Sequence, residues 1–135
     1  MHAQVTKARV AGAYRDTQLR SRSPLELVVM LYDGAIRDLT AARQAMVDRD
    51  LPKKRQVMSR ALAIVSELQS ALNMKDGGEV ATRLDSLYTY VNGRLLDANM
   101  KGDTAGLDEA VGLLATVREA WAQIASQPAA ERNVA

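Results

Sequence analysis

The sequence predicts an all-α protein, an antiparallel four-helix bundle with a short mobile arm or helix at its N-terminus. Apolar residues recur every three or four positions along four stretches of about 20 residues each. Short segments rich in Gly, Pro, Asp and Asn separate these stretches, and short connections make neighbouring helices antiparallel. The composition favours helices over strands, because Ala, Leu and Val abound while Phe is absent and Trp occurs once.

A chain of 135 residues is long enough for one domain that buries about two-thirds of its unfolded surface. We expect an N-terminal arm over residues 1–22, the bundle over residues 23–127 and a flexible C-terminal tail over residues 128–135. Tyr14 is the largest apolar side chain of the arm, so we expect the arm to dock through it. The alternative is a solvated tail with an incidental tyrosine, since short termini fray unless they are docked.

The first helix is expected from Pro24 to about Val47. Ser23 can cap its first free N–H groups, Pro24 suits the first helical position, and Glu26 can complete a capping box. Gly34 lies inside the apolar pattern of this helix, where glycine costs about 1 kcal/mol relative to alanine. The simplest compensation is another backbone that packs very close to this glycine.

The second helix is expected after a break at residues 48–52, with Asp50 as its candidate cap. The middle of this helix, residues 61–65, is apolar on all sides, which is typical of a helix that is buried on more than one side. Gly77 and Gly78 then form the clearest turn, since paired glycines can take positive φ at a helix end.

The third helix is expected to carry an apolar stripe that begins at Val80, and to end near Gly102. Asp103 or Thr104 is expected to cap the fourth helix, which ends before Pro128. Acidic residues in the first turn of this helix favour its dipole. No strand pattern competes with the four helices.

The sequence offers little for catalysis or metal binding. Cysteine is absent and the single histidine, His2, lies in the arm, so no ordinary nucleophile–base pair is available. The paired Glu-x-x-His motifs of a di-iron bundle are also missing. Asp33 and Asp38 lie about 140° apart around the helix and form no dyad, and Asp38 is expected to be solvated. We therefore expect no enzyme, no cofactor and no metal site.

The charge pattern gives little support to nucleic-acid binding. The formal net charge is +2, and the one basic cluster in the bundle, Lys53-Lys54-Arg55, is shorter than the stripes that usually bind nucleic acid. A helical regulatory module that binds nucleic acid through this cluster and the basic arm remains the alternative. The N-terminus lacks the apolar core of a signal peptide, and no stretch approaches 18 apolar residues, so we expect a cytoplasmic protein without membrane insertion.

The apolar content is larger than one bundle seam needs. Residues 61–65 and the additional Val and Ala beside the stripes of the first and fourth helices make up this surplus. One explanation is that the second helix is simply the most enclosed of the four. The other is a groove that receives an amphipathic segment of a partner, a common mode of recognition by helical domains.

A set of short motifs, in one order along nearly the whole chain, resembles a known family. The motifs are Ala13-Tyr14, Ser23-Pro24, Met30-Leu31-Tyr32-Asp33-Gly34-Ala35, Arg60-Ala61, Glu67-Leu68, Gly77-Gly78-Glu79-Val80-Ala81, Leu87-Tyr88-x-Tyr90, Arg94-Leu95, Ala98-Asn99, Leu113-Leu114 and Arg118-Glu119-Ala120-Trp121. Each motif alone is compatible with ordinary helix packing or a turn. Together they resemble the flagellar export chaperone FliS family, the cytoplasmic partners of flagellin.

The resemblance implies a chaperone that binds the disordered C-terminal segment of newly made flagellin in the cytoplasm. Binding would prevent premature polymerisation and hold the subunit for the flagellar type III export apparatus. Members of the family wrap the partner around the outside of the bundle, and no ATP is implied. The flagellar export gate and regulatory proteins are further partners that the resemblance suggests, and both a monomer and a homodimer stay open.

The resemblance also implies which residues bind the partner. In the family the arm can lie over part of the groove and move when flagellin binds, which makes Tyr14 a docking and switching residue. The other groove or groove-supporting positions are Leu31, Asp33, Tyr88 and Asn99. The chain departs from the family pattern at Arg83, where the family commonly has Asn before Leu84. If that Asn contacts the flagellin backbone, Arg83 must do so differently, or the cognate flagellin has adapted.

Overall fold

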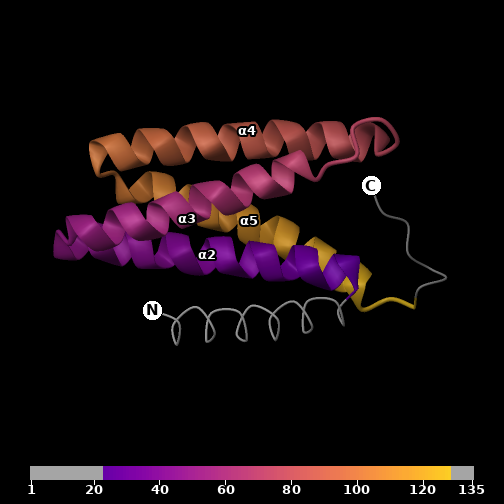
Figure 1. Ribbon diagram of the computed structural model, residues 1–135, viewed down its shortest axis with the longest axis horizontal. Coiled ribbons are helices and arrows are strands. Elements are labelled where there is room, and N and C mark those ends of the chain that lie inside the picture. The colour runs from indigo at the N-terminus through magenta and orange to yellow at the C-terminus, as the bar shows by residue number, and fades with distance from the viewer. Residues whose placement is uncertain (1–22, 129–135) are drawn as a thin grey trace, which may run out of the picture.

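The computed structural model describes residues 23–128, which form four antiparallel helices joined by short connections (Figure 1). The helices are α2 (Pro24–Asp48), α3 (Leu51–Ser70), α4 (Gly78–Lys101) and α5 (Thr104–Ala125). No strand occurs among residues 23–128, so the predicted all-α bundle is confirmed. The predicted arm and most of the predicted tail lie outside the described residues.

The four helices are not packed equally closely. α2 lies against both α3 and α5 along much of its length, whereas α4 contacts the same two helices less extensively. One end of the bundle holds the start of α2, the end of α5 and residues 71–77 between α3 and α4; we call it the open end (Figure 1). The other end holds the turns at residues 49–50 and 102–103, and we call it the turn end.

Side-chain caps begin three of the helices, as the sequence predicts. The Ser23 hydroxyl accepts a hydrogen bond from the Glu26 N–H at 3.2 Å, which is the Ser23 half of the predicted capping box. Asp50 caps α3 by accepting from the N–H of Lys53 at 3.2 Å. Asp103, rather than Thr104, caps α5. These local signals fix the helix boundaries because each cap satisfies N–H groups that the helix leaves free.

The two glycines between α3 and α4 serve different purposes, which corrects the expectation of paired positive φ. Only Gly78 has a positive φ, of 59°. Gly77 has φ −77°, but a Cβ at Gly77 would lie 2.5 Å from the Asn73 carbonyl oxygen and 2.6 Å from the Ala81 Cβ. Gly77 is therefore required for space and Gly78 for its backbone conformation.

The core lies between all four helices and is almost entirely apolar. Its largest fully buried side chains are Tyr32, Leu39, Val57, Met58, Val65, Tyr88, Val91, Leu95, Leu107 and Leu114. In the predicted all-apolar segment of α3, Ala61 and Val65 are fully buried, while Ala63 is exposed. Val80 was expected in the stripe of α4 but is 53% exposed, because it lies in the first turn, beside the α3–α4 connection.

Two positions on α2 differ from the expectations. Asp38 is not solvated: its side chain is only 10% exposed, and it accepts a hydrogen bond from Arg60 of α3 at 3.1 Å. The α2–α3 contact covers this carboxylate, and Arg60 compensates for the lost water. A Cβ on Gly34 would lie 3.3 Å from the Ile64 Cδ1 atom. The expected close neighbour of Gly34 is therefore present, but it is a side chain of α3 and not a backbone.

Candidate partner-binding site

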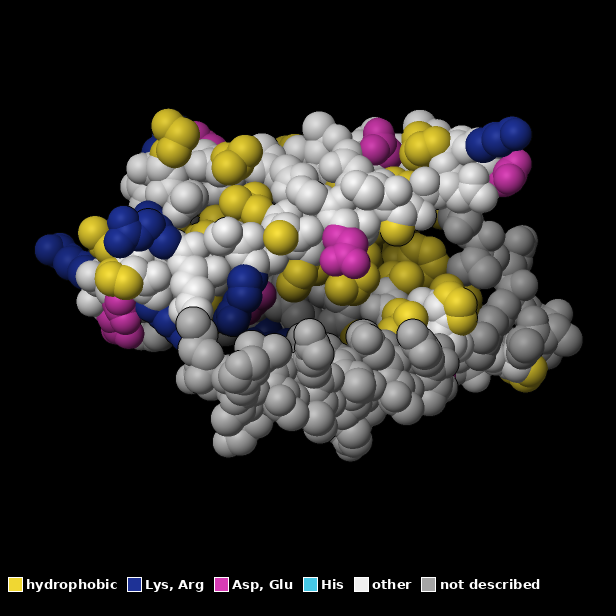
Figure 2. Space-filling view, in the orientation of Figure 1, with side chains coloured by type: hydrophobic (Ala, Val, Ile, Leu, Met, Phe, Trp, Pro, Cys, Tyr) yellow, Lys and Arg dark blue, Asp and Glu magenta, His cyan; other side chains and the backbone are white. Residues whose placement is uncertain are grey.

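The open end carries apolar side chains that pack on the core and remain partly exposed. All four helices contribute to this open-end surface: Val28, Leu31, Ile64, Leu72, Leu87 and Trp121. Figure 2 shows hydrophobic side chains gathered in a hollow between α3 and the first half of α2. Half-buried apolar side chains in a concave arrangement are what an amphipathic partner segment needs, since its own apolar face can complete their burial.

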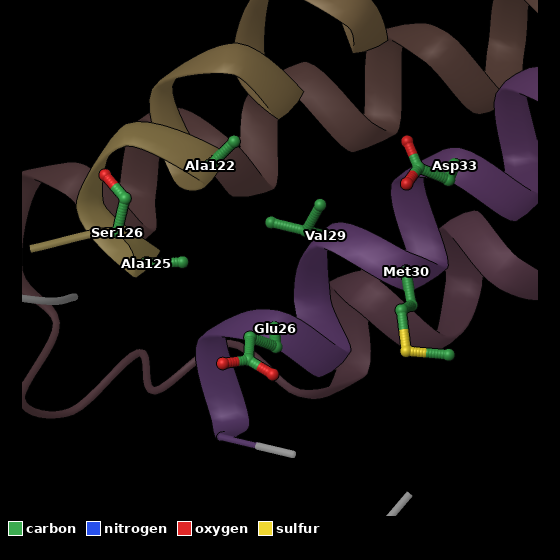
Figure 3. Close-up of a pocket in the computed structure, with 7 residues that line it drawn as sticks. All are labelled: Glu26, Val29, Met30, Asp33, Ala122, Ala125 and Ser126. Atoms are coloured by element: carbon green, nitrogen blue, oxygen red, sulfur yellow. The ribbon is translucent and has the colours of Figure 1, made fainter. Parts of the chain in front are cut away.

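A cavity of about 360 Å³ lies beside this surface, between the first turns of α2 and the last turn of α5 (Figure 3). It is lined by Glu26, Val29, Met30, Asp33, Ala122, Ala125 and Ser126. Figure 3 shows the side chains of Val29 and Ala125 directed toward one another across the space. The cavity exists because α5 presents only small side chains here. It is large enough to hold an apolar side chain of a partner, with two carboxylates in its lining.

Asp33 links α2 to α5 at the edge of this cavity. Its carboxylate accepts hydrogen bonds from Nε and Nη2 of Arg118, at 2.8 and 3.4 Å. The hydrogen bond to Asp33 and the charge of Asp33 raise the pKa of Arg118, with Glu119 adding a smaller contribution. Because both side chains of the pair are partly exposed, it contributes little to stability, and its main effect is to orient the Asp33 carboxylate.

Tyr88 lies behind the open-end surface and not on it. Its side chain is 1% exposed, and its hydroxyl shares a hydrogen bond of 2.5 Å with the hydroxyl of Tyr32, which is fully buried. Burial raises the pKa of both tyrosines above the ordinary value of 10.0, and for Tyr88 the hydrogen bond to Tyr32 adds to the rise. For Tyr32, the hydroxyl of Tyr88 and the nearby indole of Trp121 partly offset this rise in pKa. This buried bond connects α2 to α4 across the bundle.

The five partner-binding positions implied by the resemblance do not gather at one place. Leu31 belongs to the open-end surface, Asp33 lines the neighbouring cavity, and Tyr88 is buried beneath. Asn99 lies in the last turns of α4 near the turn end, where its carbonyl oxygen accepts from Nζ of Lys54 at 2.9 Å. Among the described residues, the side-chain Oδ1 atom of Asn99 is buried and has no hydrogen-bond partner. Tyr14 lies outside the described residues.

Sequence reasoning missed the contributions of Ile64 and Arg118 to this site. Ile64 fits the apolar stripe of its helix, and nothing in the stripe separates half-buried positions from core positions. Arg118 follows a stripe position of α5, but its partner Asp33 is 85 residues earlier in the chain. Only the packing of α2 beside α5 brings these two side chains together.

The chain matches the family model described as flagellar protein FliS over residues 7–128. The chain belongs to this family. It is 39% identical over 110 residues to the flagellar secretion chaperone FliS of Salmonella typhimurium, a match that covers 81% of this chain and 82% of the relative. The flagellar secretion chaperone FliS of Bacillus subtilis is 31% identical over 121 residues, which cover 90% of each chain. The resemblance that the motifs predict is thus confirmed.

These relatives are named as secretion chaperones, and chaperones are not enzymes, so no catalytic activity is indicated. Within residues 23–128, no group of three or more His, Asp or Glu side chains is placed to hold a metal ion. None of the four described helices combines the length and the apolar character that a membrane-spanning helix requires.

Proposed function

We propose that this protein binds the C-terminal segment of flagellin, prevents its premature polymerisation and holds the subunit for flagellar type III export. The observation that carries the proposal is the open-end surface, in a chain that belongs to a family of flagellar secretion chaperones. A segment that is disordered before it binds loses conformational freedom, and a broad apolar contact is needed to offset that loss. The partly exposed side chains from all four helices supply such a contact.

The predicted site residues take different parts in this proposal. Leu31 contacts the apolar face of the segment directly, while Tyr88 positions α4 behind that contact through its bond to Tyr32. Asp33 accepts hydrogen bonds at the rim, oriented by Arg118. The buried Oδ1 atom of Asn99 is an acceptor that a backbone N–H of the segment can satisfy.

The same proposal covers the parts of the chain outside the described residues. From the family resemblance, residues 23–127 form the binding domain and Tyr14 takes part in binding flagellin. The complex forms in the cytoplasm, and the export gate and regulatory proteins contact it there. Replacing Tyr14 with Ala should leave helicity and melting almost unchanged and alter the affinity for flagellin. Unchanged affinity would remove the arm from the mechanism.

Calorimetry with the cognate flagellin tests the proposal. We expect 1:1 binding to intact flagellin with a negative heat-capacity change, and no binding once the C-terminal segment of flagellin is removed. Leu31→Ala should weaken binding about tenfold by removing apolar contact area. Leu96→Ala is the matched control, since Leu96 is 52% exposed and belongs neither to the open-end surface nor to the cavity beside it. No binding to intact flagellin, or equal binding to truncated flagellin, would contradict the proposal.

Salt separates this proposal from nucleic-acid binding. Binding to phosphates weakens steeply as the salt concentration rises, whereas apolar binding does not. Lys53, Lys54 and Arg55 lie beside two carboxylates, Asp48 and Asp50, in the same turn. That mixture of charges supports the chaperone over a nucleic-acid module. Steep loss of binding with salt would favour the module instead.

A further inference from the structure

The turn end carries a second cavity, which the proposed function does not use. It measures about 260 Å³ and lies between the end of α2, the start of α3 and the turn from α4 to α5. Its lining residues are Ala45, Met46, Arg49, Leu51, Lys54 and Gly102. Most of this lining is apolar, and its two charged side chains are both cations. The cavity therefore fits an apolar side chain that has a carboxylate close to it.

Two basic side chains, Arg49 and Lys54, line this cavity, and Lys53 and Arg55 flank Lys54 in the first turns of α3. Arg49, Lys53, Lys54 and Arg55 form no ion pair with a carboxylate anywhere within residues 23–128. Lys54 donates instead to the carbonyl oxygen of Asn99. The other three are exposed. We call Arg49, Lys53 and Arg55 the basic cluster.

Most carboxylates at this end already have partners. Asp97 and Asp103 lie within ion-pair distance of Arg94, at 3.5 and 3.6 Å. Asp50 caps α3, and Asp48 accepts a hydrogen bond from Gln44 at 3.0 Å. These four carboxylates are thus engaged elsewhere, and within residues 23–128 the basic cluster has no acidic partner.

Large apolar side chains are exposed around the same cavity. Leu51 and Val47 are each 58% exposed, and Met100 is 86% exposed. Figure 2 shows Lys, Arg and hydrophobic side chains gathered at the end of the molecule that carries the α2–α3 turn. Apolar groups flanked by unpaired cations are a surface for an amphipathic, acidic segment.

The backbone at Arg49 has an unusual conformation for a residue other than glycine. Arg49 has φ 57° and is the one residue other than glycine with a positive φ among residues 23–128. The equivalent position after α4 is Gly102, with φ 66°. Arg49 is the C-cap of α2, where a left-handed residue commonly ends a helix, and a residue with a side chain costs about 1 kcal/mol or more in this conformation. The chain places a guanidinium at the cavity where glycine would be more stable.

We propose that the turn end binds an acidic segment of a partner protein, with an apolar side chain in the cavity and carboxylates against the basic cluster. A membrane or a nucleic acid fits less well, because each presents phosphates evenly and would bring them against Asp48 and Asp50 as well. A peptide can place its carboxylates only where the cations lie. The cavity lies at the opposite end of the bundle from the open-end surface, and its lining does not include Asn99, so the two partners use different residues.

Nuclear magnetic resonance on the full-length, ¹⁵N-labelled chain tests this proposal. The probe is an acetylated and amidated helical peptide of about 16 residues, with Leu on one face and Glu beside it. We expect it to shift the amide signals of residues 47–55 and of Gly102. The same peptide with Gln in place of Glu should bind about tenfold more weakly, since three charge-assisted contacts are lost. Equal binding of both peptides, or shifts confined to other residues, would overturn the proposal.

Variants of the basic cluster complete the test. Arg49→Gly should weaken binding of the acidic peptide at least about fivefold and raise the melting temperature, because glycine relieves the strained backbone. Lys53→Gln with Arg55→Gln should weaken it further, while Lys75→Gln, an exposed cation near the open end, should not. Unchanged affinity in the cluster variants would contradict the proposal. If the protein bound phosphatidylserine vesicles or single-stranded DNA more tightly than the peptide, and the same variants lost that binding, a phosphate-bearing ligand would replace the acidic segment as the partner of the turn end.

Discussion

The two ends of the bundle use the same four helices in different ways. At the turn end, Arg94 lies within ion-pair distance of Asp97 and Asp103, and Gly102 closes α4 in a left-handed conformation. At the open end, α3 and α5 finish without such a cap, at Ala71 and Ser126. The open end exposes the half-buried apolar side chains of the open-end surface and a cavity between α2 and α5, whereas the cavity at the turn end is lined by Arg49 and Lys54 as well as apolar side chains.

This difference teaches where the bundle can accept a partner. At the turn end, caps and ion pairs within the described residues engage most of the charged groups. The cations of the basic cluster are the exceptions. The open end also has internal polar contacts, the Asp33–Arg118 pair and the Tyr32–Tyr88 bond, and beside them it has apolar contacts that a partner can extend. Partner binding there adds burial without breaking existing hydrogen bonds, which makes it the less costly place to bind a disordered segment.

The largest predicted difference between the two ends is in the stability lost when a glycine at each end is replaced by alanine. Gly77→Ala at the open end should cost about 2–3 kcal/mol, because its Cβ would meet the Asn73 carbonyl and the Ala81 Cβ, neither of which can move away easily. Gly102→Ala at the turn end meets no atom within 4 Å and should cost only about 1 kcal/mol, for its positive φ. Urea unfolding measures both values. Equal losses would show that the α3–α4 connection adapts to the added methyl group.

Removing the hydroxyl group of Tyr32 or Tyr88 should produce the next largest loss of stability. Tyr88→Phe leaves the hydroxyl of Tyr32 buried without its partner and should cost about 1–3 kcal/mol. Tyr32→Phe should cost a similar amount, and the double variant should cost clearly less than the sum, since no hydroxyl is left unpaired. Urea unfolding of the four proteins gives this cycle. Additive losses would mean that the bond does not connect α2 to α4.

Alkaline pH should weaken the bundle through the same two tyrosines. Their folded-state pKa values lie above the unfolded value, so the folded state keeps phenol protons that the unfolded state releases. This stability is fully present below about pH 10 and is lost as the pH rises through the folded pKa values. The urea midpoint should therefore fall more steeply above pH 10 in the wild type than in the variant with Phe at both positions. Identical slopes would contradict the assignment.

Gly34→Ala should produce the smallest change. Alanine gains about 1 kcal/mol of helix propensity, but its methyl group must push the Ile64 Cδ1 atom back from 3.3 Å. We expect stability to change by less than about 1 kcal/mol, and flagellin to bind more weakly because Ile64 is displaced within the open-end surface. Gly93→Ala, with open space around it, is the matched control and should be more stable by the full propensity gain. If Gly34→Ala bound flagellin with unchanged affinity and were stabilised as much as Gly93→Ala, Gly34 would have no role in packing or binding.

Much of the fold could be predicted because its signals are local. Ser23 with Pro24, Asp50, and Gly102 each mark a helix boundary through groups within a few residues, and a 3.6-residue period marks the buried face. The same reasoning was wrong for Val80, which is exposed. A helical period identifies the apolar face of a helix, but it cannot show at which residue the neighbouring helices cease to cover that face.

The site depends on pairings that no local pattern contains. Asp38 was expected in water, yet α3 covers it and brings Arg60 to it. Asp33 meets Arg118, and Tyr88 meets Tyr32, only once the helices are placed side by side. The family resemblance selected Asp33 and Tyr88, whereas the contacts that explain them required the packed structure.

Hydrogen–deuterium exchange of the full chain, alone and with the cognate flagellin, tests the central claim most directly. If the open-end surface receives the flagellin segment, backbone amides of residues 27–32, 64–72 and 84–90 should exchange more slowly in the complex, while residues 47–55 keep their rate. Protection confined to residues 47–55, or absent at the open end despite complex formation, would contradict the account.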